Sequence, residues 1–153
     1  MKEIDPRMHS AEHILSGTLV KLFNCGRPFT THLEKKKSKA DYRFDRPLTE
    51  GETREIERRV NEVIASDLPV TAQIVPRSEA AQVFDLGRLP EETGETIRIV
   101  NIGEYDSCPC SGEHVRSTKE IGHFRIISST HEDGALRVRF KLDASSAPQP
   151  PRE

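Results

Sequence analysis

The chain has 153 residues, a length that suits one domain with a buried core. Its 23 basic and 25 acidic residues leave a formal net charge of -2, which excludes a generally basic nucleic-acid-binding protein. Apolar runs of only a few residues argue against a membrane span, and the N-terminal residues lack the apolar stretch of a signal peptide, so we expect a cytoplasmic protein. Three cysteines form a poor disulfide framework, which leaves metal binding, reactivity or packing as their roles.

The first element is expected to be a helix that begins at Asp5-Pro6. An aspartate before a proline is typical of a helix N-terminus, and apolar residues then recur at helical spacing up to Phe23. The run Asn24-Cys25-Gly26 predicts the end of this helix. The stretch "RPFTTHLEKKKSKADYRFD" predicts two strands on either side of a lysine-rich turn.

The second half of the chain predicts one more long helix and several strands. Thr49 and Glu52 have the spacing of a capping box, and the helix that they open should bury Ile56, Val60, Val63 and Ile64. The other predicted elements are a strand at 70–75, a short helix at 77–84, a strand at 96–103, a loop at 105–115, and a hairpin of strands 123–132 and 135–142 around Asp133-Gly134. We therefore predict a single α+β domain over residues 1–143, with a mainly antiparallel sheet packed with helices, followed by a flexible tail at 144–153.

Two pairs of potential metal ligands share the same four-residue spacing. His9 and His13 would lie on one face of the first helix, within reach of one cation, although two partly exposed histidines near a helix start are an equally good interpretation. Cys110 and His114 form the second pair, which alone would be read as a buried thiol beside a loop histidine. Together the pairs make a mixed nitrogen and sulfur set suited to tetrahedral zinc, between the first helix and a loop in the C-terminal half. A loosely held donor, or a fifth position, would also let water or substrate bind.

The segments "HSAEHIL" and "CSGEHVRSTKEIG" together resemble the zinc-binding editing module of alanyl- and threonyl-tRNA synthetases, whose pattern is HxxxH followed by CxxxH. Size and layout are most similar to the short form of the freestanding alanyl-tRNA editing proteins (AlaX type), and the resemblance extends over about residues 5–142. It implies that His9, His13, Cys110 and His114 bind zinc. The role of Cys108 then stays open. It could be a substitute ligand, a thiol behind the ligands or an incidental residue, and we favour an incidental residue.

The resemblance implies hydrolysis of the ester between a wrong amino acid and the tRNA 3′ end, with Ser-tRNA(Ala) as the expected substrate. Glu12, three residues after His9, is a candidate catalytic helper or an ordinary solvated glutamate. Thr30, with its neighbour Thr31, is a candidate for recognition of the serine hydroxyl. Glu113 stands where alanyl editing modules commonly have threonine in CGGTH, and its carboxylate could attract the substrate ammonium, act as a base or repel tRNA phosphate.

Contacts with the acceptor end of mischarged tRNA are expected at local basic residues. The cluster "KKKSK" contains Lys35, Lys36 and Lys37, which either hold the phosphate backbone or simply form a solvated turn that discourages edge pairing. Arg116 and Lys119 follow the ligand loop and are the second candidate set.

Two other functions remain open from the sequence. "HSAEH" also fits the HxxEH pattern of an inverted zinc peptidase, in which Glu12 would be the general base. A relative with an altered ligand loop could instead bind zinc and tRNA without hydrolysis.

Overall fold

The structure is a computed structural model, and it describes residues 5–83, 95–110 and 112–143. The tail expected at 144–153, and the domain boundary before it, lie outside the described residues. The elements in chain order are α1 (Pro6–Phe23), β1 (Thr30–Leu33), β2 (Ser38–Arg43), α2 (Glu50–Ala65), β3 (Val70–Pro76), α3 (Arg77–Val83), β4 (Thr96–Ile102), β5 (Asp106–Pro109), the 3-10 helix η2 (Thr118–Ile121), β6 (His123–Glu132) and β7 (Ala135–Asp143).

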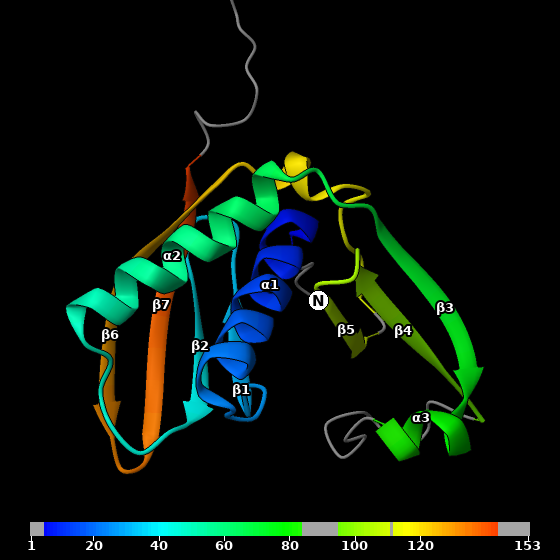
Figure 1. Cartoon of the computed structure of the whole chain (residues 1–153), viewed down its shortest axis with the longest axis horizontal. Helices are drawn as coiled ribbons and strands as arrows, with labels where there is room; N and C mark the ends of the chain where they lie inside the picture. Colours follow the sequence, from blue (N-terminus) through cyan, green and yellow to red (C-terminus); the bar gives the residue numbers. More distant parts are fainter. Residues whose placement is uncertain (1–4, 84–94, 111, 144–153) are drawn as a thin grey trace, which may run out of the picture.

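The helix α1 is the central element of the fold. Asp5 accepts a hydrogen bond from the Arg7 amide at 2.8 Å, and Asn24 ends the helix in a left-handed conformation, which confirms both predicted ends. Figure 1 shows α1 between two sheets, with α2 beside it. Every residue from 8 to 19 is buried as a result, polar residues included. The interpretation of His9 and His13 as partly exposed histidines is therefore wrong.

A four-stranded antiparallel sheet, in the order β1-β2-β7-β6, forms one layer. Its inner face carries fully buried Tyr42, Val138 and Phe140, which belong to the same apolar cluster as the buried residues of α1 and α2. The capping box of α2 is present, and its buried residues are the four predicted. The predicted turn of the C-terminal hairpin is confirmed too, because Asp133 and Gly134 both have positive φ.

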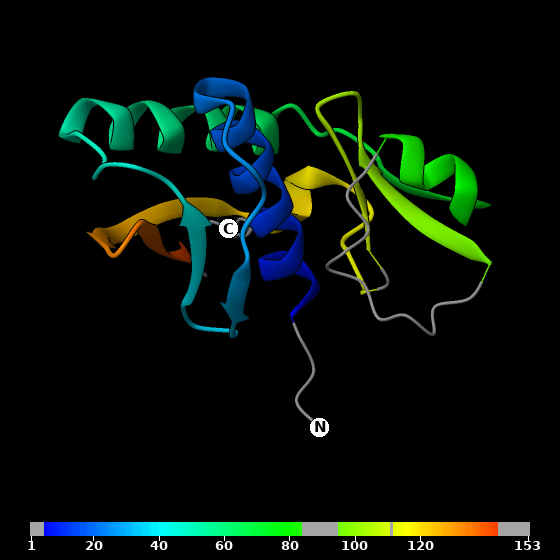
Figure 2. The ribbon, with the colours of Figure 1, turned by 90° about the horizontal axis from the view of Figure 1, so that it is seen from below.

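A second antiparallel sheet, in the order β3-β4-β5, lies on the other side of α1 (Figures 1 and 2). The two sheets replace the one sheet that we predicted. Strand β5 lies inside the stretch that was expected to be a loop, and it was missed because only four residues pair, in a segment that ends at Pro109. Pairing of Cys108 and Pro109 with β4 fixes the course of the chain, and Cys110, the first residue after β5, lies beside α1.

The described parts of the chain contain no helix that has both the length and the apolar character needed to cross a membrane.

Candidate metal centre

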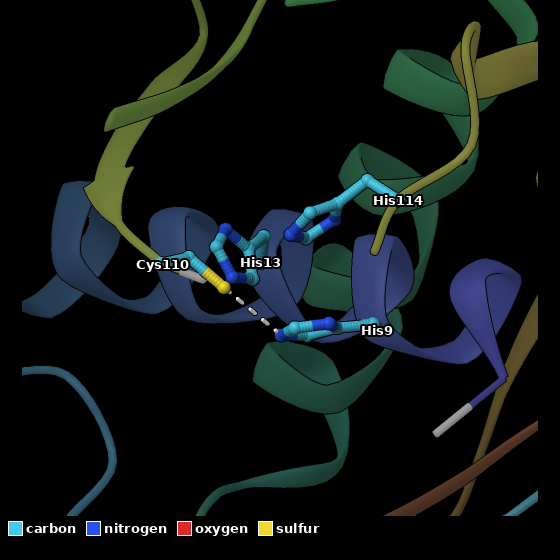
Figure 3. Close-up of side chains that lie close together, drawn as sticks. All are labelled: His9, His13, Cys110 and His114. Carbon is cyan, nitrogen blue, oxygen red and sulfur yellow. Dashed lines mark hydrogen bonds between the residues drawn. The ribbon is translucent and has the colours of Figure 1, made fainter. Parts of the chain in front are cut away.

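Four side chains from two distant segments meet beside α1. His9 and His13 come from successive turns of α1, and Cys110 and His114 come from the segment after β5. One possible ligand atom of each residue lies within 4.8 Å of the ligand atoms of the other three. Figure 3 shows the three rings and the thiol gathered around one small volume. The structure thus brings together the two pairs that the sequence singled out.

The spacing inside this cluster is close to what one small cation requires. Donor atoms of a tetrahedral zinc site lie about 3.3–3.6 Å apart, given metal distances of about 2.0–2.1 Å to nitrogen and 2.3 Å to sulfur. The Cys110 Sγ atom is 3.3 Å from His9 Nε2. The ring centroids of His9 and His114 are 4.2 Å apart, and those of His13 and His114 are 4.5 Å apart. The donors can therefore converge on one ion with small side-chain adjustments.

Hydrogen bonds to Nδ1 on the far side of two rings leave the Nε2 atom of each ring for a metal. His9 donates from Nδ1 to the Glu113 carbonyl at 3.2 Å, which leaves the lone pair of Nε2 facing Cys110. His114 Nδ1 lies 2.9 Å from Ser10 Oγ, which also accepts a hydrogen bond from the Val115 amide. The buried Nε2 of His114 has no hydrogen-bond partner among the described residues. A buried ring nitrogen without a hydrogen-bond partner fits a position in which it would bind a metal ion.

Burial keeps these imidazoles neutral, which is the form that binds metal. Desolvation lowers the pKa of His9, although the nearby Glu12 carboxylate works in the opposite direction. Desolvation, with smaller contributions from His9 and Arg98, lowers the pKa of His114 to about 3. Both rings should therefore be unprotonated at neutral pH.

His13 has a carboxylate behind it that sequence reasoning missed. Asp106 Oδ2 of β5 is 3.9 Å from His13 Nδ1. Arg27 donates to the two oxygens of Asp106 at 2.8 and 3.4 Å and to the His13 carbonyl at 3.4 Å. Desolvation opposes the charge of Arg27, but Asp106, with smaller contributions from Cys108 and Glu12, raises the pKa of the guanidinium. This approach to α1 needs Gly17, where a Cβ atom would lie 2.6 Å from Asp106 Oδ1.

Glu12 is buried under the cluster, with 5% of its surface exposed, so the interpretation as a solvated glutamate is wrong. It accepts a hydrogen bond from Ser16 at 2.5 Å, and Ser16 also contacts the hydroxyl of fully buried Tyr42 at 2.8 Å. Arg27 can balance the charge of only one of the two carboxylates, Glu12 and Asp106. A divalent cation together with a Cys110 thiolate would balance the other, so the charges of the site favour a dication.

The ligand segment is held by a residue of β4. Arg98 donates to the Cys110 carbonyl at 3.0 Å and to the Gly112 carbonyl at 2.7 Å. A Cβ atom at Gly112 would lie 2.3 Å from Cε1 of His9, so only glycine allows the segment to pass this ring. The sequence signal for Gly112 was its place between two ligands, whereas nothing in the sequence singled out Arg98.

The remaining residues singled out from the sequence are not among the four grouped donors. The side chain of Glu113 is exposed, and only its carbonyl contacts His9. Thr30 is exposed at the start of β1 and makes no hydrogen bond to the cluster within the described residues. Cys108 is buried and is not one of the four grouped donors. The exposed basic candidates are Lys35, Lys36 and Lys37 in the turn between β1 and β2, and Arg116 and Lys119 after His114.

The fold and the cluster define a small α+β protein with a candidate His/Cys metal centre. Residues 97–140 match the family described as threonyl and alanyl tRNA synthetase second additional domain. The chain is 30% identical to an alanine–tRNA ligase of Treponema denticola over 137 residues. This match covers 88% of the chain and 23% of the ligase. The chain is 33% identical over 91% of its length to the ligase of Staphylococcus saprophyticus, and 32% identical over 80% to that of Bacillus subtilis, with 16% and 14% of those proteins covered.

The chain is thus related to alanine–tRNA ligases over about 90% of its own length, and residues 97–140 match the second additional domain. It spans less than a quarter of the length of these relatives.

Proposed function

We propose that this protein is a zinc-dependent aminoacyl-tRNA hydrolase that acts in trans in the cytoplasm and removes the amino acid from mischarged tRNA, with Ser-tRNA(Ala) as its substrate. The observation that carries the proposal is the convergence of His9, His13, Cys110 and His114 on one small volume, in a chain related to alanine–tRNA ligases. The four residues are proposed as the zinc ligands.

A bound zinc ion would supply Lewis-acid polarisation of the ester carbonyl or activation of water, whose pKa it can lower toward about 7. The chain's own residues prepare the site for that chemistry. The Glu113 carbonyl and Ser10 orient His9 and His114, and Asp106 with Arg27 lies behind His13. Such outer contacts tune metal affinity in known sites, and their loss typically costs 10–100-fold.

Two exposed side chains remain proposed substrate contacts. Glu113 directly precedes His114, and its exposed carboxylate is proposed to meet the ammonium group of a bound aminoacyl ester. Thr30 lies three residues after Arg27 and is proposed to meet the hydroxyl of a seryl group. Glu12 is proposed to act through the charge of the site, because its carboxylate is already held by Ser16 and buried. The same burial disfavours the peptidase alternative, in which Glu12 would have to act on water.

The test is deacylation by purified, zinc-loaded protein of Ser-tRNA(Ala), Gly-tRNA(Ala) and Ser-tRNA(Thr), scored as released amino acid. We expect release from Ser-tRNA(Ala), loss of release after chelation, and recovery when zinc is restored. If all three substrates stay intact while zinc and tRNA bind, the protein is a zinc- and tRNA-binding relative without hydrolytic activity, and the hydrolase assignment fails. Hydrolysis of peptides in place of these esters would favour the peptidase.

A further inference from the structure

The side of the four-stranded sheet that faces away from α1 and α2 carries a concentration of positive charge. Alternation along the strands determines which residues point there. Ala40 and Tyr42 of β2, and Val138 and Phe140 of β7, are fully buried against the helices, so their neighbours point outward. The outward-pointing cations of β2, β6 and β7, which we call the basic face, are Lys39, Arg43, Arg125, Arg137, Arg139 and Lys141.

Carboxylates on the same face account for only part of this charge. Arg137 donates to Asp41 at 2.8 and 3.0 Å, and Arg125 donates to Asp143 at 2.9 Å. The hydrogen bond from Arg137 lowers the pKa of the Asp41 carboxyl group, and the nearby charges of Lys39 and Arg139 help to lower it. Among the described residues, however, no hydrogen bond or ion pair joins Lys39, Arg139 or Lys141 to a carboxylate. Three long cationic side chains are thus available for a partner.

The strand register places like charges directly opposite each other. Lys39 of β2 is the cross-strand partner of Arg139 of β7, and Arg125 of β6 is the partner of Lys141 of β7. Like charges in directly opposed positions repel each other, and the neighbouring carboxylates Asp41 and Asp143 offset only part of this repulsion. An anion bound between them would remove the repulsion.

A hollow joins the basic face to the lysine-rich turn. Its volume is about 210 Å³, and it is lined by His32, Glu34, Lys37, Ser38, Lys39 and Arg139. His32, Lys39 and Arg139 lie in one row across β1, β2 and β7. The turn between β1 and β2 and the first turn of α1, which carries the metal-ligand candidate His9, lie on the same side of the molecule in both views (Figures 1 and 2). The positive surface therefore extends from the sheet toward the end of the molecule that holds the candidate metal centre.

We propose that the basic face docks the phosphate backbone of an RNA duplex. The identity of this duplex rests on the proposed function, which makes it the acceptor stem of the substrate tRNA. Backbone recognition fits the composition of the face, because the aromatic residues of β2, β6 and β7 (Tyr42, Phe124 and Phe140) are all fully buried and offer no surface for base stacking. Contacts of cations with phosphates are independent of sequence, and A-form duplexes are recognised largely by shape and backbone. The turn lysines would then extend a larger surface whose centre is the Lys39–Arg139 pair.

The test compares the wild-type protein with the double variant Lys39→Ala/Arg139→Ala. Binding of uncharged tRNA is measured by fluorescence anisotropy over a series of salt concentrations. Loss of two phosphate contacts should reduce the slope of log K against log salt by about 1.4–1.8, which corresponds to roughly 25- to 60-fold weaker binding at 0.1 M salt. The melting temperature should change little, because the substitution removes a repulsive pair together with the attraction of both cations to Asp41. A charge-matched control, Arg54→Ala/Arg58→Ala on exposed positions of α2, should leave the slope and affinity close to those of the wild type.

Hydrolysis of seryl-adenosine, which lacks a phosphate backbone, separates this inference from the proposed function. Variant protein that hydrolyses this ester like the wild type but binds tRNA weakly would support docking on the basic face. Unchanged tRNA affinity and salt slope in the folded double variant would overturn it, whether or not the ester is hydrolysed. It would also be overturned if the variant lost binding only to anionic phospholipid vesicles or to a poly-glutamate peptide, since the partner would then be a membrane or an acidic protein.

Discussion

Substitution of Gly112 by alanine should disable the candidate metal centre without unfolding the protein. The new Cβ atom would lie 2.3 Å from Cε1 and 2.7 Å from Nδ1 of His9, whereas ordinary contacts begin near 3.4 Å. Either the ring or the ligand segment must therefore move by about 1 Å. Metal–ligand distances tolerate only about 0.2 Å, so His9 could not keep its place together with Cys110 and His114. The hydrogen bond from His9 Nδ1 to the Glu113 carbonyl would be lost as well.

We expect the Gly112→Ala protein to bind zinc at least 100-fold more weakly than the wild type, which is the upper end of the cost of losing an outer contact. Competition with a chromophoric chelator measures this affinity, and the charge-transfer band of a cobalt-loaded sample reports whether the thiolate of Cys110 still binds. Gly51→Ala is the matched control, because a Cβ atom at this position of α2 meets nothing within 4 Å. It should leave metal affinity unchanged and, if anything, stabilise the helix by up to about 1 kcal/mol.

The reasoning is refuted if Gly112→Ala binds one equivalent of zinc with wild-type affinity and an unchanged cobalt spectrum. The ring of His9 would then not be a ligand in the position that the structure gives it. Equal loss of affinity in the Gly51→Ala control would also refute it, because the effect would then be a general loss of stability.

Three further predictions concern the same centre. Cys110→Ala should abolish tight zinc binding, whereas Cys108→Ala should retain most of it; equal losses by elemental analysis would show that the sulfur ligand is wrongly assigned. Ser10→Ala should weaken zinc binding 10–100-fold, because Nδ1 of His114 loses the hydroxyl that orients it, while Ser10→Thr should restore part of the affinity if the methyl group is accommodated. Acid should release the metal, because protons compete for the ligands. Since burial lowers the pKa of His9 and of His114, the latter to about 3, half-release in a zinc-indicator titration should occur below pH 6.5, and release at or above pH 6.5 would contradict the role of burial.

The sequence determined those features that depend on neighbours along the chain. Asp5 with Pro6, and Thr49 with Glu52, identified two helix starts because capping is completed within a few residues. Asp133 and Gly134 identified the hairpin turn for the same local reason. The two ligand pairs were also visible, since a spacing of four residues on a helix places side chains one above the other.

The tertiary structure decided everything that depends on partners distant in the chain. β5 pairs with the adjacent strand β4, but its four residues carry too weak a local signal to predict it, and its distant partner is α1, beside which it packs. The burial of Glu12 follows from a helix enclosed by two sheets, so that no periodicity of α1 could reveal it. Asp106 comes close to His13 only because Gly17 leaves room for it and Arg27 balances its charge. These contacts join residues that are 79 to 93 positions apart in the sequence, where spacing carries no information about distance.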